Sequence, residues 1–279
     1  MNLKTLLAAA AVSMVAGSAV AQTAEWRTVS PDNLWVIDTS KGRVLVELEP
    51  RAAPAHIERI RTLTNRGFYD GLKFHRVIPN FMAQTGDPQG TGAGGSDLPD
   101  LKGEFSFRRG RDSGFVAVEN SGPGVRGIMG SLPVATQPDA QMFVTADLKV
   151  GAGGLFCPGV AGMARAGSPD SANSQFFLMS GQNDALNGGY TTFGRVVQGL
   201  DVVKALKTGS DAEDGKVANP DIMTKVQLAS ALPEGQRPTV RVAVPGSAPF
   251  NAAVEAARAA RGAQFGICDV QPVVEVTGG

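Results

Sequence analysis

The fifteen residues from Phe74 to Pro88, FHRVIPNFMAQTGDP, constrain the fold of this chain more than any other segment. They place one arginine, one glutamine and several large apolar side chains along a strand-like stretch. Arg76 offers a planar fork of donors that keeps its charge near neutral pH, while Val77, Phe81 and Met82 offer apolar surface. Such a segment could hold an apolar group beside a carbonyl. A buried strand with polar residues at its rim would have the same composition.

The order of the residues in this segment resembles the catalytic strand and loop of the cyclophilins, a class of peptidyl-prolyl cis–trans isomerases. Two later blocks resemble the other active-site segments of that family, in the same order: VAGMARAGSPDSANSQFFLM at 160–179 and LNGGYTTFGRVV at 186–197. The resemblance implies that Arg76 and Gln84 are catalytic. It also implies a set of peptide-binding residues, namely His75, Phe81, Met82, Ala164, Arg165, Gln175, Phe177, Leu186 and Tyr190.

Short β-rich runs indicate a mainly β fold. We expect a hairpin from 34–38 and 43–48, helices at 54–67 and 200–207, and a closing strand at 222–228. Many short strands with two helices favour a closed antiparallel barrel with capped ends, which leaves no free sheet edge. The resemblance implies the same architecture, a closed eight-stranded cyclophilin-like barrel with a helix over each mouth, within an isomerase domain at 22–230.

Two segments extend beyond that barrel. The chain is longer than a minimal family member between the Gly-rich loop and Cys157, so residues from about 113 to 156 are interpreted as an insertion with strands at 115–118 and 142–144. The residues at 231–279 form a C-terminal extension. Its pattern predicts a strand at 240–244, a helix at 249–261 and a strand at 267–276, a small α/β unit of βαβ type.

The first 21 residues have the pattern of an export signal, with Lys4, an apolar run at 6–15 and the small-residue site Ala19-Val20-Ala21. Cleavage would leave 279 − 21 = 258 residues. A membrane anchor is the alternative, but the apolar run is shorter than the roughly 20 residues that span a bilayer. We therefore expect a periplasmic or secreted protein that does not span a membrane after cleavage.

Cys157 and Cys268 are the only cysteines, and export would place them where a disulfide can persist. The sequence alone does not show whether these two cysteines pair. They could form one disulfide, or they could be two separate small apolar residues.

Composition argues against several other functions. The chain carries 26 basic and 26 acidic residues without a basic block, so nucleic acid is not an expected partner. The run Gly90 to Gly95 fits GxGxxG by letter but lacks the preceding strand and the following helix of a nucleotide site. His56 and His75 are too few for a metal centre, and no metal or cofactor is expected; His56 should lie at the surface and His75 should support the loop beside Arg76.

Ala185 departs from the family pattern, because many members carry an aromatic residue there. One wall of the pocket would then be missing or supplied by the insertion, and cyclosporin binding is expected to be weak. The predicted function is isomerisation of X-Pro bonds in unfolded or folding polypeptides, by non-covalent stabilisation of the twisted amide. The alternative is a non-catalytic chaperone or scaffold on the same barrel. A small-molecule barrel of lipocalin type does not fit, because the resemblance implies that the recognised side chains lie on the outer face of the barrel.

Overall fold

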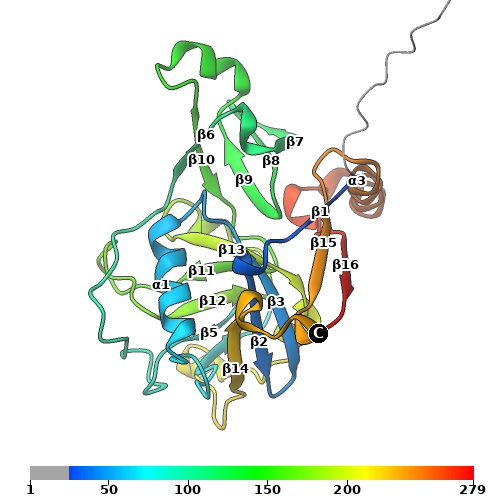
Figure 1. Ribbon diagram of the computed structural model, residues 1–279. Coiled ribbons are helices and arrows are strands. Elements are labelled where there is room, and N and C mark those ends of the chain that lie inside the picture. The colour runs from blue at the N-terminus through cyan, green and yellow to red at the C-terminus, as the bar shows by residue number, and fades with distance from the viewer. Residues whose placement is uncertain (1–24) are drawn as a thin grey trace, which may run out of the picture.

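The computed structural model describes residues 25–279, so the predicted export signal at 1–21 lies outside the described residues. The largest unit is an eight-stranded antiparallel sheet in the order β14-β2-β3-β13-β11-β12-β5-β4 (Figure 1). Its strands are β2 (Leu34–Thr39), β3 (Gly42–Leu48), β4 (Arg76–Ile78), β5 (Met82–Thr85), β11 (Val160–Met163), β12 (Phe176–Met179), β13 (Thr192–Gln198) and β14 (Met223–Leu228).

The sheet is an open half-barrel, which corrects the predicted closed barrel. β14 and β4 lie at its two ends and do not pair with each other. The chain before β4 meets β14 through the isolated bridge Lys73–Ile222 and through hydrogen bonds such as that from the Gly71 N–H to the Met223 carbonyl oxygen at 2.7 Å. The edge of β4 is already occupied, because the Val77 N–H donates to the carbonyl oxygen of Gly215 at 2.8 Å and the Gly209 N–H donates to that of Val77 at 2.9 Å. The chain around Gly209 to Gly215 therefore covers the edge that β14 would need for closure.

Helix α1 (Pro54–Asn65) buries Ile57, Ile60 and Leu63 in the core of the half-barrel. Within that core, the Trp35 ring lies 4.8 Å from the Phe176 ring and 6.2 Å from the Phe193 ring, centroid to centroid.

Two predictions about the helices are wrong. Helix α2 (Leu200–Lys204) ends earlier than Lys207, because the Lys207 N–H donates instead to the Asp221 carboxylate at 2.8 Å. His56 is fully buried rather than exposed. Its Nδ1 lies 2.7 Å from the Glu104 carboxylate, which also accepts the backbone N–H groups of Ala55 and His56 at the start of α1.

Residues 107–154 form a separate five-stranded antiparallel sheet, in the order β6-β10-β9-β8-β7, that projects from the half-barrel (Figure 1). Its strands are β6 (Phe107–Arg109), β7 (Phe115–Ser121), β8 (Gly124–Met129), β9 (Leu132–Thr136) and β10 (Val150–Gly154). We call it the insertion sheet. The predicted strand at 142–144 is instead part of a 3-10 helix, η3 (Asp139–Val144), because the chain after Pro138 makes local turns such as Gln141 N–H to Pro138 O at 3.0 Å.

The C-terminal extension joins the first described strand. β1 (Trp26–Thr28), β15 (Thr239–Ala243) and β16 (Val274–Thr277) form an antiparallel sheet, with helix α3 (Ala248–Arg261) between β15 and β16. A parallel βαβ unit is therefore not formed. The predicted strand at 267–276 begins only at Val274, because η9 (Ile267–Asp269) makes a turn in which Asp269 accepts the Gly266 N–H at 2.9 Å.

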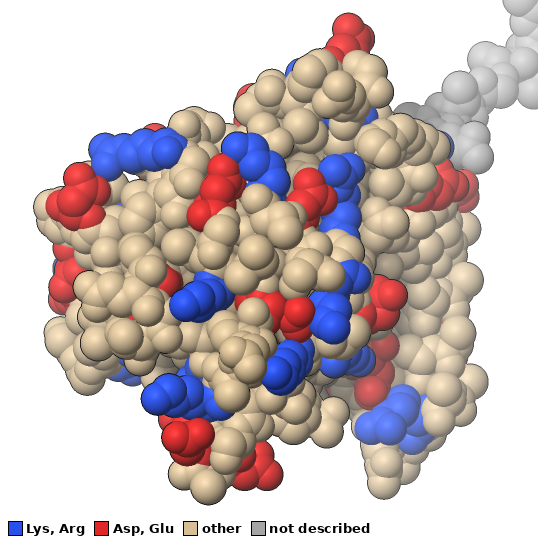
Figure 2. All heavy atoms as spheres, turned by 90° about the horizontal axis from the view of Figure 1, so that it is seen from below, with Lys and Arg blue, Asp and Glu red and all other residues tan. Residues whose placement is uncertain are grey.

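The described surface shows no segregation of charge on the face seen in Figure 2, where basic and acidic side chains alternate. Within residues 25–279, no helix is both long enough and apolar enough to cross a membrane.

Candidate active site

The site is built on a row of residues that face one another across neighbouring strands. Phe177 of β12 pairs with Gln84 of β5, and Gln84 pairs with Arg76 of β4. Successive side chains of a strand point to opposite faces of the sheet. Phe176 and Leu178 therefore enter the core, while Phe177 lies on the outer face beside Gln84 and Arg76.

This outer face forms a cavity of about 110 Å³. Nine of the residues predicted from the sequence line it, namely Arg76, Phe81, Met82, Gln84, Ala164, Arg165, Phe177, Leu186 and Tyr190. Three distant segments, 76–84, 164–177 and 186–190, thus meet at one place.

A chain of hydrogen bonds fixes the polar side of the cavity. Arg76 Nη1 donates to Gln84 Oε1 at 3.2 Å, and Gln84 Nε2 donates to Gln175 Oε1 at 2.9 Å. Gln175 Nε2 in turn donates to the carbonyl oxygens of Gly92 at 3.0 Å and Gly94 at 2.7 Å. The orientation of Arg76 is therefore linked to the Gly-rich loop.

The other side of Arg76 contacts a residue that the sequence analysis missed. Arg76 Nε donates to the carbonyl oxygen of Asp214 at 2.8 Å, and Nη2 donates to its carboxylate at 2.9 Å. The Arg76 side chain is 28 % exposed and that of Asp214 is 79 % exposed. Because the contact joins residues 138 positions apart, no local sequence signal points to it.

Aromatic rings form the apolar side. The Phe177 ring stacks on Phe156, with centroids 5.6 Å apart, and meets the edge of Tyr190 at 6.1 Å. A Cβ on Gly162 would lie 2.6 Å from Phe177 Cζ and 2.5 Å from Phe156 Cε1. Only glycine therefore lets both rings approach β11. The Arg165 guanidinium covers Tyr190, with Cζ 4.4 Å from the ring centroid.

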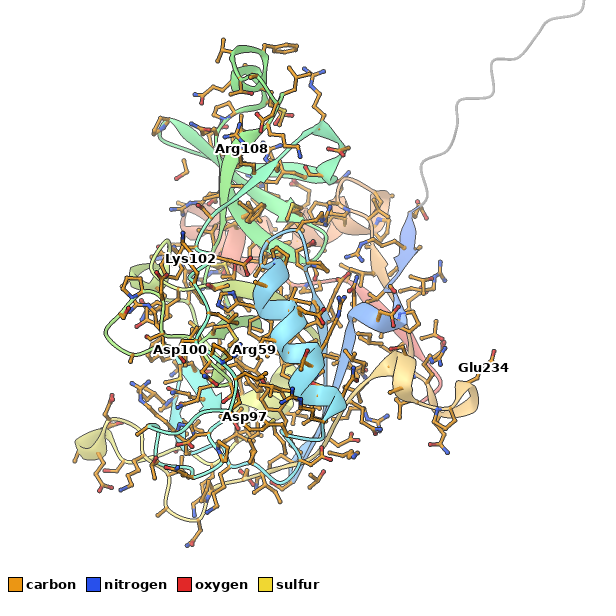
Figure 3. All side chains as sticks on the ribbon, turned by 60° about the vertical axis from the view of Figure 1, so that its left-hand side comes forward. Arg59, Asp97, Asp100, Lys102, Arg108 and Glu234 are labelled. Carbon is orange, nitrogen blue, oxygen red and sulfur yellow. A yellow bond between two sulfur atoms is a disulfide. The ribbon has the colours of Figure 1, made fainter. Side chains whose placement is uncertain are left out.

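A larger hollow of about 610 Å³ adjoins this cavity and shares Gln84, Ala164 and Arg165 with it. It is also lined by Gln175, Asn173, Asp100 and the loop residues from Gly92 to Ser96. Behind it, Arg59 of α1 donates to the carbonyl oxygens of Pro99 at 2.6 Å and Asn173 at 3.2 Å. Figure 3 shows Arg59 beside the segment that carries Asp97 and Asp100.

Asp87, also missed by the sequence analysis, organises the Gly-rich loop. Its buried carboxylate accepts the backbone N–H groups of Gln89 at 2.8 Å, Thr91 at 2.8 Å and Gly92 at 2.7 Å. Burial opposes ionisation, but these N–H groups outweigh it and lower the pKa of Asp87 to about 2. The run Gly90 to Gly95 is thus a hydrogen-bonded loop that lines a hollow, and no helix follows it.

Two other predicted features lie outside the cavities. His75 is buried, neither ring nitrogen has a hydrogen-bond partner, and burial lowers the pKa of its imidazole. It lines neither the cavity nor the larger hollow. Ala185, in η4 (Asp184–Leu186), is exposed and does not line the cavity, and neither does any described residue from 113 to 156.

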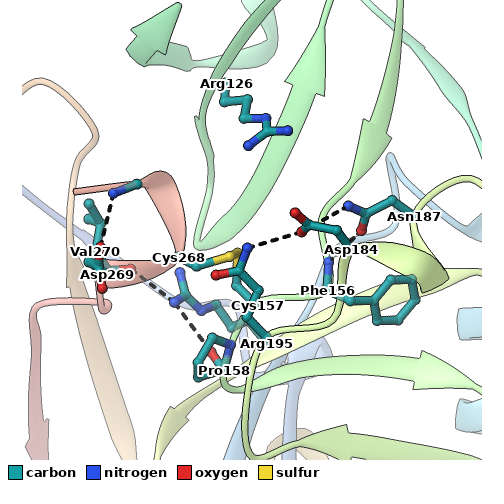
Figure 4. The surroundings of a disulfide bond; sticks show 12 residues. Arg126, Phe156, Cys157, Pro158, Asp184, Asn187, Arg195, Cys268, Asp269 and Val270 are labelled. Carbon is teal, nitrogen blue, oxygen red and sulfur yellow. Dashed lines mark hydrogen bonds between the residues drawn. A yellow bond between two sulfur atoms is a disulfide. The ribbon is translucent and has the colours of Figure 1, made fainter. Parts of the chain in front are cut away.

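Cys157 and Cys268 are joined by a disulfide next to the aromatic side of the site (Figure 4). The neighbouring Phe156 N–H donates to Asn187 Oδ1 at 2.9 Å, which links the disulfide to the loop that carries Leu186. Arg195 is fully buried nearby and donates to the carbonyl oxygens of Val270 at 2.9 Å and Ser131 at 3.2 Å. Desolvation lowers the pKa of Arg195 to about 9.

No group of three or more His, Cys, Asp or Glu side chains within residues 25–279 could hold a metal ion.

Comparison with known proteins relates this chain to one family. The model of the family described as cyclophilin type peptidyl-prolyl cis-trans isomerase/CLD matches residues 34–228. A probable peptidyl-prolyl cis-trans isomerase of Brucella suis is 37 % identical over 237 residues, covering 81 % of this chain and 96 % of that protein. The crystal structure of cyclophilin AquaCyp293 from Hirschia baltica superposes with a TM-score of 0.82 at 33 % identity, covering 96 % of this chain and 99 % of that one.

Proposed function

Since this chain belongs to the cyclophilin-type peptidyl-prolyl cis–trans isomerases, we propose that it accelerates rotation of X-Pro bonds in unfolded or folding polypeptides at the cavity beside Arg76. The observation that carries this proposal is the row Phe177, Gln84 and Arg76 across three paired strands. This row places the apolar Phe177 ring near the Arg76 guanidinium, which Gln84 and Asp214 hold in position. Such a site suits a proline ring on the apolar side and its amide on the charged side.

Rotation of an X-Pro bond crosses a barrier near 20 kcal/mol and takes tens of seconds or more unaided. It needs neither a nucleophile nor a proton acceptor. A site that binds the twisted amide more tightly than the planar forms by about 7 kcal/mol would accelerate rotation roughly 10⁵-fold.

In the proposed mechanism, the proline ring contacts Phe81, Met82, Phe177, Leu186 and Tyr190. Twisting the amide localises the lone pair of the prolyl nitrogen, and Arg76 donates to that nitrogen. Arginine has five N–H donors, of which three already bind Gln84 and Asp214, so two remain for the substrate. Because these contacts fix the guanidinium before binding, the twisted amide is stabilised without reorganisation of the site.

The flanking peptide is proposed to lie along the larger hollow, against Gln175 and the backbone near Arg165. Clients are proposed to be exported proteins in a periplasm or outside the cell. The Cys157–Cys268 disulfide supports an oxidising compartment, where such bonds persist.

The test is the cis-to-trans relaxation of a short X-Pro peptide with purified protein comprising residues 22–279. The proposal predicts acceleration that rises linearly with enzyme concentration and is inhibited by excess unlabelled X-Pro peptide. A folded protein that leaves the relaxation rate unchanged would refute the proposed activity.

A further inference from the structure

The large hydrophobic side chains that the described residues expose all lie within one short segment. They are Phe143, Val144 and Leu148, which are 69 %, 85 % and 61 % exposed. We call these three residues the apolar tip. The tip lies between β9 and β10, at the end of the insertion sheet that is far from the half-barrel (Figure 1).

Leu148 is unusual in its backbone as well as in its exposure. Its φ angle of 51° lies in the left-handed region, which glycine and asparagine adopt far more readily than leucine. Asparagine would tolerate this backbone conformation better than leucine and would expose less apolar surface. The outlier therefore points to a function of its apolar side chain.

A hollow of about 360 Å³ lies at the tip, lined by Met142, Phe143 and Leu148 together with charged residues of both signs. Its lining includes two basic residues, Arg111 and Lys149, and two acidic residues, Asp112 and Asp147, so it carries no net charge. Asp147 is paired with Arg108, whose Nη2 lies 2.6 Å from its carboxylate. The Arg111 guanidinium lies over the Phe143 ring, with Cζ 4.6 Å from the ring centroid. A neutral apolar hollow suits an uncharged peptide segment better than an anionic lipid surface, which attracts clustered basic residues.

The size of the tip argues against a permanent contact with a second copy of the chain. Three side chains of this size would bury on the order of 400 Å², about half of what one partner buries in a stable interface. A small apolar contact of this kind suits weak and reversible binding of an extended chain.

We propose that the apolar tip binds apolar segments of unfolded polypeptides, as a second contact for the chain whose X-Pro bond occupies the catalytic cavity. This inference rests on the proposed function for the identity of the client. Binding at the tip raises the effective concentration of the same client's proline segments near the cavity, without any change in the chemistry there.

The experiment measures how tightly the protein comprising residues 22–279 binds reduced, carboxymethylated α-lactalbumin, an unfolded chain that cannot refold. The double variant Phe143→Ser/Leu148→Asn should bind it at least tenfold more weakly, while Leu148→Met, which keeps the apolar surface, should bind like the parental protein. Turnover of a short X-Pro peptide should be the same for all three proteins.

Leu148→Asn alone separates binding from folding, because asparagine tolerates the left-handed backbone. This variant should keep or raise the melting temperature and still bind the probe more weakly. Unchanged binding by the double variant would overturn the proposal. So would concentration-dependent dimers in the parental protein that the double variant abolishes, because a second copy would then occupy the tip. If the probe binds through the tip but the short peptide is not turned over, the proposed binding role of the tip is supported and only the proposed enzymatic function is refuted.

Discussion

At the scale of single residues, Arg76 is held from two sides, by Gln84 and by Asp214. The Asp214 side chain is largely exposed, and an exposed ion pair contributes only about 0–1 kcal/mol. Asp214→Ala should therefore lower kcat for a short X-Pro peptide by about two- to fivefold with little change in KM, because it loosens a group that acts in the twisted state. Steady-state kinetics on the peptide measures both quantities.

Two variants act as controls for Asp214. Asp214→Asn keeps a side-chain carbonyl acceptor and, unlike alanine, tolerates the left-handed φ of 52° at this position, so it should restore most of kcat. Glu213→Gln removes a neighbouring acid for which no contact with Arg76 is found, and it should behave like the parental protein. A larger loss in Asp214→Asn than in Asp214→Ala would contradict a role through geometry.

Ala185 is exposed and precedes Leu186, which lines the cavity. The resemblance to the family implies an aromatic residue at this position in many members. We expect weak cyclosporin binding by the parental protein. Ala185→Trp should strengthen that binding at least tenfold, because an indole adds apolar area at the rim. Fluorescence titration of both proteins with cyclosporin measures the difference, and tight binding by the parental protein would contradict the expectation.

Nine of the predicted site residues line one cavity, because they lie in three local blocks that fold together. Their catalytic and binding roles stay predictions. Asp214 could not be predicted from the sequence, because its position beside Arg76 depends on the path of the chain from Gly209 to Gly215 along the edge of β4. Asp87 lies inside the first block, and its position just before a Gly-rich loop could have indicated a loop-organising carboxylate.

At the scale of elements, the Gly-rich loop depends on the ionised form of Asp87. The pKa of Asp87 is about 2 in the folded protein, below the ordinary aspartate value near 3.9. Its contribution to stability is therefore complete above about pH 4 and is lost as the pH falls towards 2. Asp87→Asn should cost about 1–3 kcal/mol in the free energy of unfolding at neutral pH.

Urea unfolding of the Asp87→Asn variant and the parental protein between pH 7 and pH 2 tests this claim. The difference in stability between the two proteins should shrink below pH 4. A difference that stays constant down to pH 2 would show that the charge of Asp87 does not act through these hydrogen bonds.

The disulfide connects elements that lie 111 residues apart, the segment before β11 and the turn η9 of the extension. Closing so long a loop in the unfolded chain is worth about 2–5 kcal/mol. The variant Cys157→Ala/Cys268→Ala should lose about that much stability in urea unfolding, and reductant should destabilise the parental protein but not the variant. Equal stability of the parental protein with and without reductant would refute this contribution.

Strand and helix positions near strong local patterns were predictable, as in β2, β3 and α1. The closure of the sheet was not predictable, because it depends on which distant segment hydrogen-bonds along the edge of β4. The strand expected at 142–144 failed for a related reason. Three apolar residues fit either a strand or the last part of a 3-10 helix that buries Met142 and exposes Phe143.

At the scale of the whole molecule, one hydrophobic cluster joins the site, the insertion sheet and the extension. It contains Met82 and Phe177 of the site, Met129 and Leu132 of the insertion sheet, and Phe250 of α3, among other residues. Buried Arg195 adds hydrogen bonds to the carbonyl oxygens of Ser131 in the insertion sheet, Pro158 before β11 and Val270 in the extension. The insertion sheet and the extension therefore pack in the same cluster as Met82 and Phe177, which line the cavity.

The central claim is that Arg76 stabilises the twisted amide and does not merely hold the peptide. The most direct test is the cis-to-trans relaxation of an X-Pro peptide with the parental protein and Arg76→Ala side by side, together with peptide binding to each. We predict a loss of at least 100-fold in kcat/KM, with peptide affinity changed by less than about fivefold. Near-parental turnover by a folded Arg76→Ala protein would contradict the account.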